Sequence, residues 1–151
     1  MSSDFHSDLI RNLAHQATAR PLVPEKFKDC INGTWEVVDG RVNVNGNVDL
    51  STLNLTRLPI KFGTVSGKFF CQGNRLTSLE GAPRSVGGSF DCSHNQLTTL
   101  EGAPSSVGWY FDCSNNPLTS LEGAPSSVGL YFHCNPDVPG LKKYRRRLRY
   151  A

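Results

Sequence analysis

The chain repeats itself every 21 residues, and this repeat constrains its fold more than any other feature of the sequence. Four cysteines recur at this spacing, and columns of other residues keep the same step. So many columns with one interval indicate a repeated structural unit. The columns are Cys71, Cys92, Cys113 and Cys134; Asn74, Asn95 and Asn116; Leu76, Leu97 and Leu118; Leu79, Leu100 and Leu121; Val65, Val86, Val107 and Val128; and Phe69, Phe90, Phe111 and Phe132.

Each copy of the repeat combines a strand pattern with a turn. The phrase FxCxxNxL alternates apolar and polar residues at its start, which is typical of a strand with one buried face. The phrase LTxLEGAP then turns the chain with glycine and proline. One such unit cannot bury its apolar side alone, but stacked copies form a parallel sheet with strands about 4.8 Å apart. We therefore predict a repeat solenoid with a parallel sheet of about four to five strands and little helix within the repeats.

These residues resemble the leucine-rich repeat. In FDCSHNQLTTLEGAP, the last four positions of the motif L-x-x-L-x-L-x-x-N-x-L are matched by Phe90, Cys92, Asn95 and Leu97. Residues 35–136 are similar to short leucine-rich-repeat proteins of unassigned role from large tailed bacteriophages. The resemblance implies inward-facing cysteines and a ladder of asparagines whose amides bond to backbone groups, but it implies little about activity.

The five cysteines are expected to be free thiols. Their number is odd, and none of them forms a C-x-x-C pair. Ligands of a zinc ion converge on one point, whereas thiols on stacked strands line up along an axis. We expect the cysteine column to be a buried ladder, and we expect neither a metal nor a cofactor. Cys30 lies outside this column and has no obvious partner.

The two ends of the chain differ from the repeats, and we divide the sequence into three parts. Residues 1–43 are predicted to form an N-terminal cap, 44–136 the repeat array, and 137–151 a basic C-terminal cap or tail. The cap would contain an amphipathic helix over residues 3–19 and a hairpin with its turn at Asp39 and Gly40.

The outward-facing strand positions are the ones where function should be visible. The column before each cysteine contains Asp91 and Asp112, which lie on adjacent levels of the stack, one level being one 21-residue repeat. Their charges repel each other, and folding alone gives no reason for them. Large aromatic residues gather beside them, which indicates a protein interface. In the alternative, a C-terminal helix carrying Leu141, Tyr144 and Leu148 covers the aromatics. The predicted partner-binding residues are Lys68, Phe70, Asp91, Trp109, Tyr110, Asp112, Leu130, Tyr131 and His133.

Catalysis is not expected on this face. Two carboxylates and a histidine can serve acid and base chemistry, but an open sheet lacks a pocket that excludes water. No serine or cysteine nucleophile lies beside His133 on the same face, because Cys134 points the other way. We therefore predict that the protein is not an enzyme.

The charge of the chain is concentrated in its tail. The formal net charge is +3, but six of the sixteen basic residues lie within LKKYRRRLRY, so ten basic residues face thirteen acidic ones elsewhere. The tail could contact phosphates or an acidic partner, or it could be a capping helix whose charges face water. Its basic residues are Lys142, Lys143, Arg145, Arg146, Arg147 and Arg149.

Together these features predict a non-catalytic protein-protein interaction module of the host bacterial cytoplasm. No apolar run of 18 residues and no secretory signal are expected, so no membrane contact is predicted. The phage resemblance implies that the module inhibits or redirects a host protein, such as a defence factor or a nucleic-acid enzyme. The alternative is a nucleic-acid-associated protein acting through the tail. Homodimer formation stays open at this point.

Overall fold

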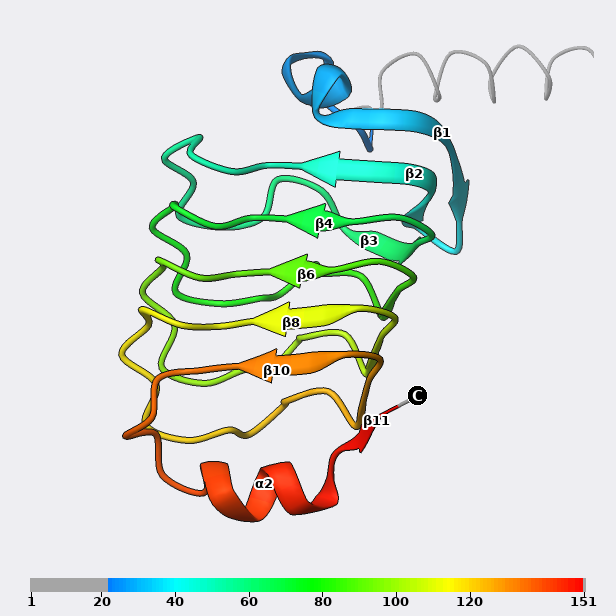
Figure 1. Ribbon diagram of the computed structural model, residues 1–151. Coiled ribbons are helices and arrows are strands. Elements are labelled where there is room, and N and C mark those ends of the chain that lie inside the picture. Colours follow the sequence, from blue (N-terminus) through cyan, green and yellow to red (C-terminus); the bar gives the residue numbers. More distant parts are fainter. Residues whose placement is uncertain (1–21, 151) are drawn as a thin grey trace, which may run out of the picture.

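The computed structural model describes residues 22–150, and it is a β-solenoid of about four turns (Figure 1). The helix expected over residues 3–19 lies outside the described part. The elements are η1 (Glu25–Cys30), β1 (Ile31–Val38), β2 (Arg41–Asp49), β3 (Phe62–Val65), β4 (Phe69–Phe70), β5 (Ser85–Val86), β6 (Phe90–Asp91), β7 (Ser106–Val107), β8 (Tyr110–Asp112), β9 (Ser127–Val128), β10 (Tyr131–His133), α2 (Leu141–Arg147) and β11 (Arg149–Tyr150).

Each turn of the solenoid contributes two short strands, whereas the sequence predicted one. The described residues form an eleven-stranded sheet instead of four to five strands. One ladder, β2-β4-β6-β8-β10, carries the predicted phenylalanine column, and the other, β3-β5-β7-β9-β11, carries the valine column. The prediction missed the second ladder because β5, β7, β9 and β11 are only two residues long and show no alternation to detect.

Both ladders start from the long strand β2. Its first half pairs with β3 and its second half with β4, both parallel, while β1 pairs antiparallel along its other edge. Side chains of β2 also bond to the next turn: Asn43 accepts the N–H of Thr64, and Asn47 accepts the N–H of Lys68. Strand β2 therefore belongs to the hairpin and to the stack at once.

From the turn of β5 and β6 onward, the corner between the two strands requires glycine, at Gly87, Gly108 and Gly129. At Gly108, an added Cβ would lie 2.0 Å from the carbonyl oxygen of Gly87 one turn earlier. Hydrogen bonds between turns continue through this corner, as in the bond from the Gly108 N–H to the Val86 carbonyl. A side chain here would force the levels apart, so the small residues of the repeat are part of its spacing.

Equivalent side chains stack through the core. The rings of Phe69, Phe90, Phe111 and Phe132 lie nearly parallel, with centroids 5.2–5.4 Å apart. The four repeat cysteines are buried beside them, and none of the five cysteines forms a disulfide. Burial raises the pKa of the Cys71 thiol, so this thiol stays neutral in the core. The cysteine column is thus a packed ladder, as its 21-residue spacing predicted.

The asparagine column holds consecutive turns together. The amide nitrogen of Asn95 donates to the carbonyls of Cys92 in its own turn and Cys71 in the preceding one. Its amide oxygen accepts the N–H of Leu76. Asn74 and Asn116 make equivalent bonds with their own neighbours. Each of these buried amides therefore satisfies backbone groups on two levels, where water has no access.

The C-terminal end of the stack is occupied by α2, which lies beyond β10 in Figure 1. Leu141 and Leu148 are buried in the common core. The ring of Tyr144 packs on Phe132 at 4.6 Å, and its hydroxyl donates to the carbonyl of Pro125. The aromatic stack of the core thus ends on a helical residue.

We predict that Asn95→Ala lowers the free energy of unfolding by about 2–4 kcal/mol, because it leaves several buried backbone groups without partners. Urea unfolding followed by circular dichroism measures the change. The matched control is Gln96→Ala, an exposed neighbour that should change stability by less than about 0.5 kcal/mol. Equal effects of the two substitutions would contradict the structural role of the asparagine column.

Candidate interaction face

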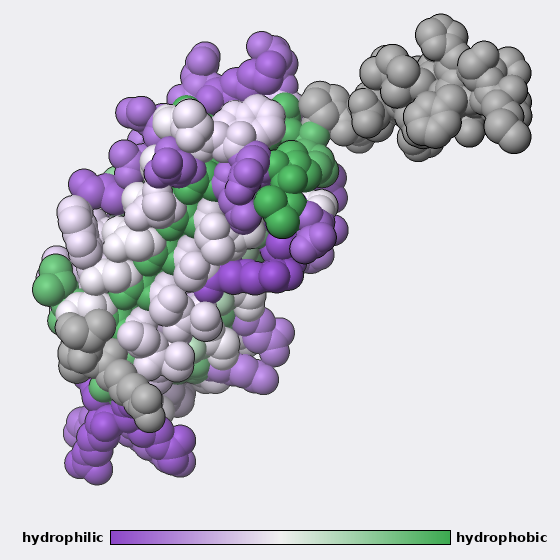
Figure 2. Space-filling model, turned by 90° about the vertical axis from the view of Figure 1, so that its right-hand side faces the viewer, coloured by the Kyte–Doolittle hydropathy of each residue, from purple (hydrophilic) through white to green (hydrophobic). Residues whose placement is uncertain are grey.

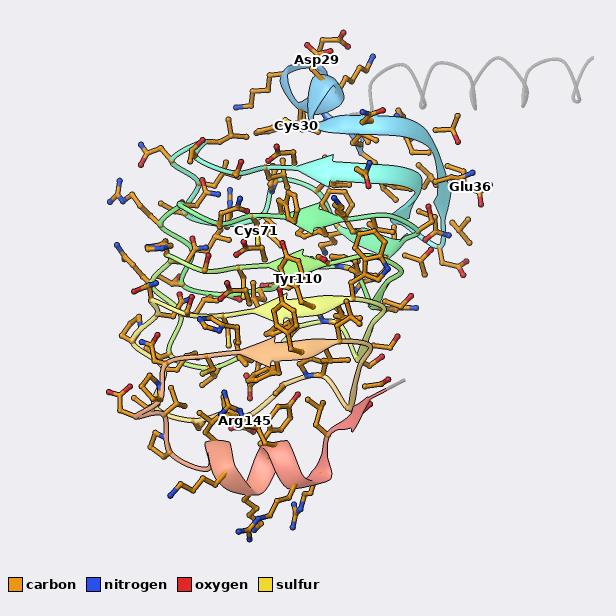
Figure 3. The ribbon with its side chains drawn as sticks, in the orientation of Figure 1. Asp29, Cys30, Glu36, Cys71, Tyr110 and Arg145 are labelled. Atoms are coloured by element: carbon orange, nitrogen blue, oxygen red, sulfur yellow. The ribbon has the colours of Figure 1, made fainter. Side chains whose placement is uncertain are left out.

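The outward face of the first ladder brings the predicted partner-binding residues together. In β8 and β10 the central phenylalanine is buried, while the residues on either side of it are at least partly exposed. All nine predicted residues lie on or immediately before β4, β6, β8 and β10, and none of them is fully buried. Figure 3 shows Tyr110 in front of the sheet, away from the core. The predicted alternation of inward and outward residues on this ladder is confirmed.

Large apolar side chains are concentrated on the last two levels of this face. Trp109, Leu130 and Tyr131 are 50%, 61% and 54% exposed. Tyr110 and Tyr131 are cross-strand neighbours whose rings stack at 5.4 Å. We call Trp109, Tyr110, Leu130 and Tyr131 the aromatic patch.

One side chain from an earlier level reaches the aromatic patch. The ammonium group of Lys68 lies over the ring of Trp109, 5.5 Å from its centroid, which is the geometry of a cation–π contact. The level between them carries Gly88 and Ser89, both buried, so no large side chain separates the two. Lys68 thus borders the patch on its N-terminal side.

Helix α2 does not cover the aromatic patch. Its tyrosine packs against Phe132, on the core side of β10, and Trp109, Leu130 and Tyr131 each keep at least half of their surface exposed. The alternative in which the C-terminal helix hides the aromatics is therefore wrong. The spacing of Leu141, Tyr144 and Leu148 indicated a packed helix, but the helix packs on the end of the stack.

The acidic column has a folding role that the sequence analysis did not expect. One carboxylate oxygen of Asp91 accepts both the N–H of Ser93 (2.9 Å) and its hydroxyl (2.6 Å). Asp112 binds Ser114 in the same way, and Asp49 binds Ser51. These carboxylates close the turns after β2, β6 and β8, so the statement that folding gives no reason for them is wrong. The recurring Asp-x-Ser spacing is the signal that could have shown it.

The environment of Asp91 makes its negative charge costly. Burial raises the pKa of this carboxyl, the hydrogen bonds from Ser93 oppose the shift, and the adjacent carboxylate of Asp112 adds to it. The folded protein therefore binds this proton more tightly than the unfolded chain does. It follows that ionisation of Asp91 reduces stability.

The histidine at the end of this column lies beside a carboxylate. His133 pairs in register with Asp112 on the neighbouring strand, and its side chain is exposed. Cys134 is buried on the opposite face. Within residues 22–150, no group of three or more histidine, cysteine or acidic side chains is placed to hold a metal ion.

The basic residues of the tail form a separate surface on α2. Figure 2 shows hydrophilic side chains gathered at the bottom of the molecule, where Figure 1 places this helix. None of these side chains forms an ion pair with the residues described, and the side chain of Arg149 is not described. The exposed basic residues of α2 are Lys142, Lys143, Arg145, Arg146 and Arg147.

Comparisons with family models, with curated proteins and with solved structures give no match for this chain. In the described residues, no helix has the length and apolar character needed to cross a membrane. The chemistry of the two surfaces is therefore the basis for assigning a function.

We predict that Asp91→Asn stabilises the protein at pH 7 by up to about 1 kcal/mol, because the amide oxygen can still accept from Ser93 while the partly buried charge beside Asp112 is removed. The raised pKa fixes the sign of the pH dependence. The advantage of the variant should grow as pH rises from about 3.9 through the folded-state pKa, and it should vanish below that range.

The companion variant Asp91→Ala should instead lose about 1–3 kcal/mol, because Ser93 is buried and would lose its acceptor. Thermal or urea unfolding between pH 3.5 and 8 measures both variants. A gain that is the same at every pH would show that the charge of Asp91 is not its cause.

Proposed function

We propose that the protein is a non-catalytic interaction module that binds another protein through its aromatic patch. The observation that carries this proposal is the contiguous exposure of Trp109, Leu130 and Tyr131 on a regular sheet face. Exposed clusters of aromatic residues mark binding surfaces, since single scattered apolar residues are normal but gathered ones cost solubility. Tryptophan and tyrosine also dominate the energetics of protein interfaces.

The surroundings of the patch suit a protein partner. Lys68 borders it on one side, and Asp112 and His133 follow it along the strands. An apolar centre with a polar border is the usual anatomy of such an interface. The stacked rings of Tyr110 and Tyr131 are already ordered, so little side-chain entropy is lost on binding. A partner with an apolar projection framed by charged groups fits this surface.

The finer identity that we propose is a short leucine-rich-repeat protein encoded by a bacteriophage. The 21-residue period, the inward cysteines and the asparagine bonds support the repeat class. In this proposal the N-terminal hairpin and α2 cap the array. The module acts in the cytoplasm of the host bacterium, where it inhibits or redirects a host protein such as a defence factor or nucleic-acid enzyme.

We predict that Trp109→Ala combined with Tyr110→Ala weakens partner binding by about 2 kcal/mol or more, because aromatic anchors supply most of the binding energy of such interfaces. Tagged full-length protein is incubated with host lysate, and the captured proteins are identified by mass spectrometry. The affinity of the purified candidate for wild type and variant is then measured by calorimetry.

The matched control is Gln96→Ala combined with Thr98→Ala, two exposed residues in the turn after β6. This variant should retain full binding. If both double variants bind the candidate equally, its binding site lies elsewhere and the proposed function of the patch is refuted.

A second candidate function, nucleic-acid binding through α2, is favoured by the unpaired positive charge of that helix. Five exposed basic side chains on seven residues would release counterions on contact with phosphates. We predict that Lys142→Glu combined with Arg146→Glu abolishes retention of DNA or RNA at low salt. Fluorescence anisotropy with a labelled oligonucleotide measures this binding. The salt concentration is varied from about 50 to about 200 mM, a range over which phosphate contacts weaken strongly. Binding by wild type that is independent of salt would exclude the tail as the site.

A further inference from the structure

The hairpin strand β1 leaves one edge of the sheet open. It pairs with β2 along one side only, and η1, which directly precedes it in the chain, also contacts it. Every residue from 32 to 38 is exposed, including Trp35 at 41% and Val37 at 45%. No other described segment covers this edge. The sequence analysis found the hairpin but did not identify its outer edge as a surface.

The turn geometry determines which backbone groups of β1 face outward. Asp39 and Gly40 both have positive φ angles, 51° and 73°, as in a type I′ turn, so Val38 and Arg41 form a hydrogen-bonded pair. Antiparallel pairs alternate, and residues 32, 34, 36 and 38 therefore bond to β2. The N–H and C=O groups of residues 33, 35 and 37 point away from the sheet.

This edge lacks the features that usually protect such strands. The segment INGTWEVV contains no proline and no lysine, and its only charged residue is Glu36. Trp35 and Val37 lie opposite Val44 and Val42, so they share the core-facing side of the sheet. They are exposed because the stack of described residues ends at this level.

We propose that β1 pairs antiparallel with β1 of a second copy of this chain, with the twofold axis at Trp35. The outward groups of Trp35 then bond to those of the second Trp35, and residue 33 of each chain bonds to residue 37 of the other. The two sheets become continuous. Because both copies use the same strand, the assembly ends at two chains and does not grow into a fibre.

The residues of β1 favour this self-pairing. The two Trp35 rings become direct cross-strand neighbours, a pairing that stabilises antiparallel sheets. Val37 faces Gly33 of the second copy, where no side chain competes for space. Glu36 faces Thr34, so like charges are not opposed, whereas a shift of the axis to residue 36 would place the two glutamates opposite each other. Because the core-facing apolar side chains of both copies come together, a second copy suits this edge better than an unrelated peptide.

The test uses the full-length protein in size-exclusion chromatography with light scattering and in sedimentation equilibrium. Wild type should show twice the mass of one chain at high concentration and dissociate on dilution. Val37→Pro removes only an outward N–H and should weaken the dimer by about tenfold or more. Its matched control Val37→Thr keeps that donor and should remain dimeric. Circular dichroism establishes that both variants are folded.

A cross-linking variant checks the register independently of folding stability. In a Cys30→Ser background, Trp35→Cys should form a disulfide-linked dimer under mild oxidation, since opposed strand residues lie within disulfide reach. Asn47→Cys, on the paired strand β2, should stay monomeric on a non-reducing gel. A wild-type chain that is monomeric at all concentrations would refute the proposal, and so would a dimer that Val37→Pro leaves intact. Binding of an unrelated protein at β1 by a monomeric chain would also refute it.

Discussion

The whole structure depends on hydrogen bonds between backbone levels that are 21 residues apart. Each level is too short to satisfy its own backbone polar groups or to enclose a core. Its N–H and C=O groups therefore form hydrogen bonds with the levels on either side. The amide of Asn95 shows the principle, since it bonds to carbonyls of two consecutive levels at once. Phenylalanine stacking adds apolar contact in the same direction. Fold and stability are therefore properties of the stack as a whole, as expected for repeat proteins.

Both candidate surfaces lie toward the C-terminal end of the stack, on β8 and β10 and on α2. On the β6 level the outward positions carry the small or turn-forming residues Ser89 and Asp91. The last levels tolerate bulky side chains, and there Trp109 and Leu130 replace the glycines of earlier copies. The aromatic patch thus lies on the levels where the repeat departs from its small residues.

The sequence was sufficient to predict the parallel stack, the buried cysteines and the outward position of the aromatic patch, because each follows from strand alternation within a fixed period. It was not sufficient for the second ladder, whose strands such as Ser85–Val86 are defined only by pairing with the next level. The carboxylates were misjudged for a related reason. Their spacing to Ser93 and Ser114 is present in the sequence, but strand alternation alone does not distinguish a carboxylate that closes a local turn from one that faces a partner.

Near-identical levels also create an ambiguity of register. Phe90 stacks on Phe69 and on Phe111 in almost the same geometry, so a pairing shifted by one whole level would give it nearly the same contacts. Only the ends distinguish these arrangements, through the asparagines of β2 and the ring of Tyr144. The terminal elements consequently fix the register of the levels between them. Loss of either end would leave an array that can exchange levels with a neighbouring molecule by domain swapping.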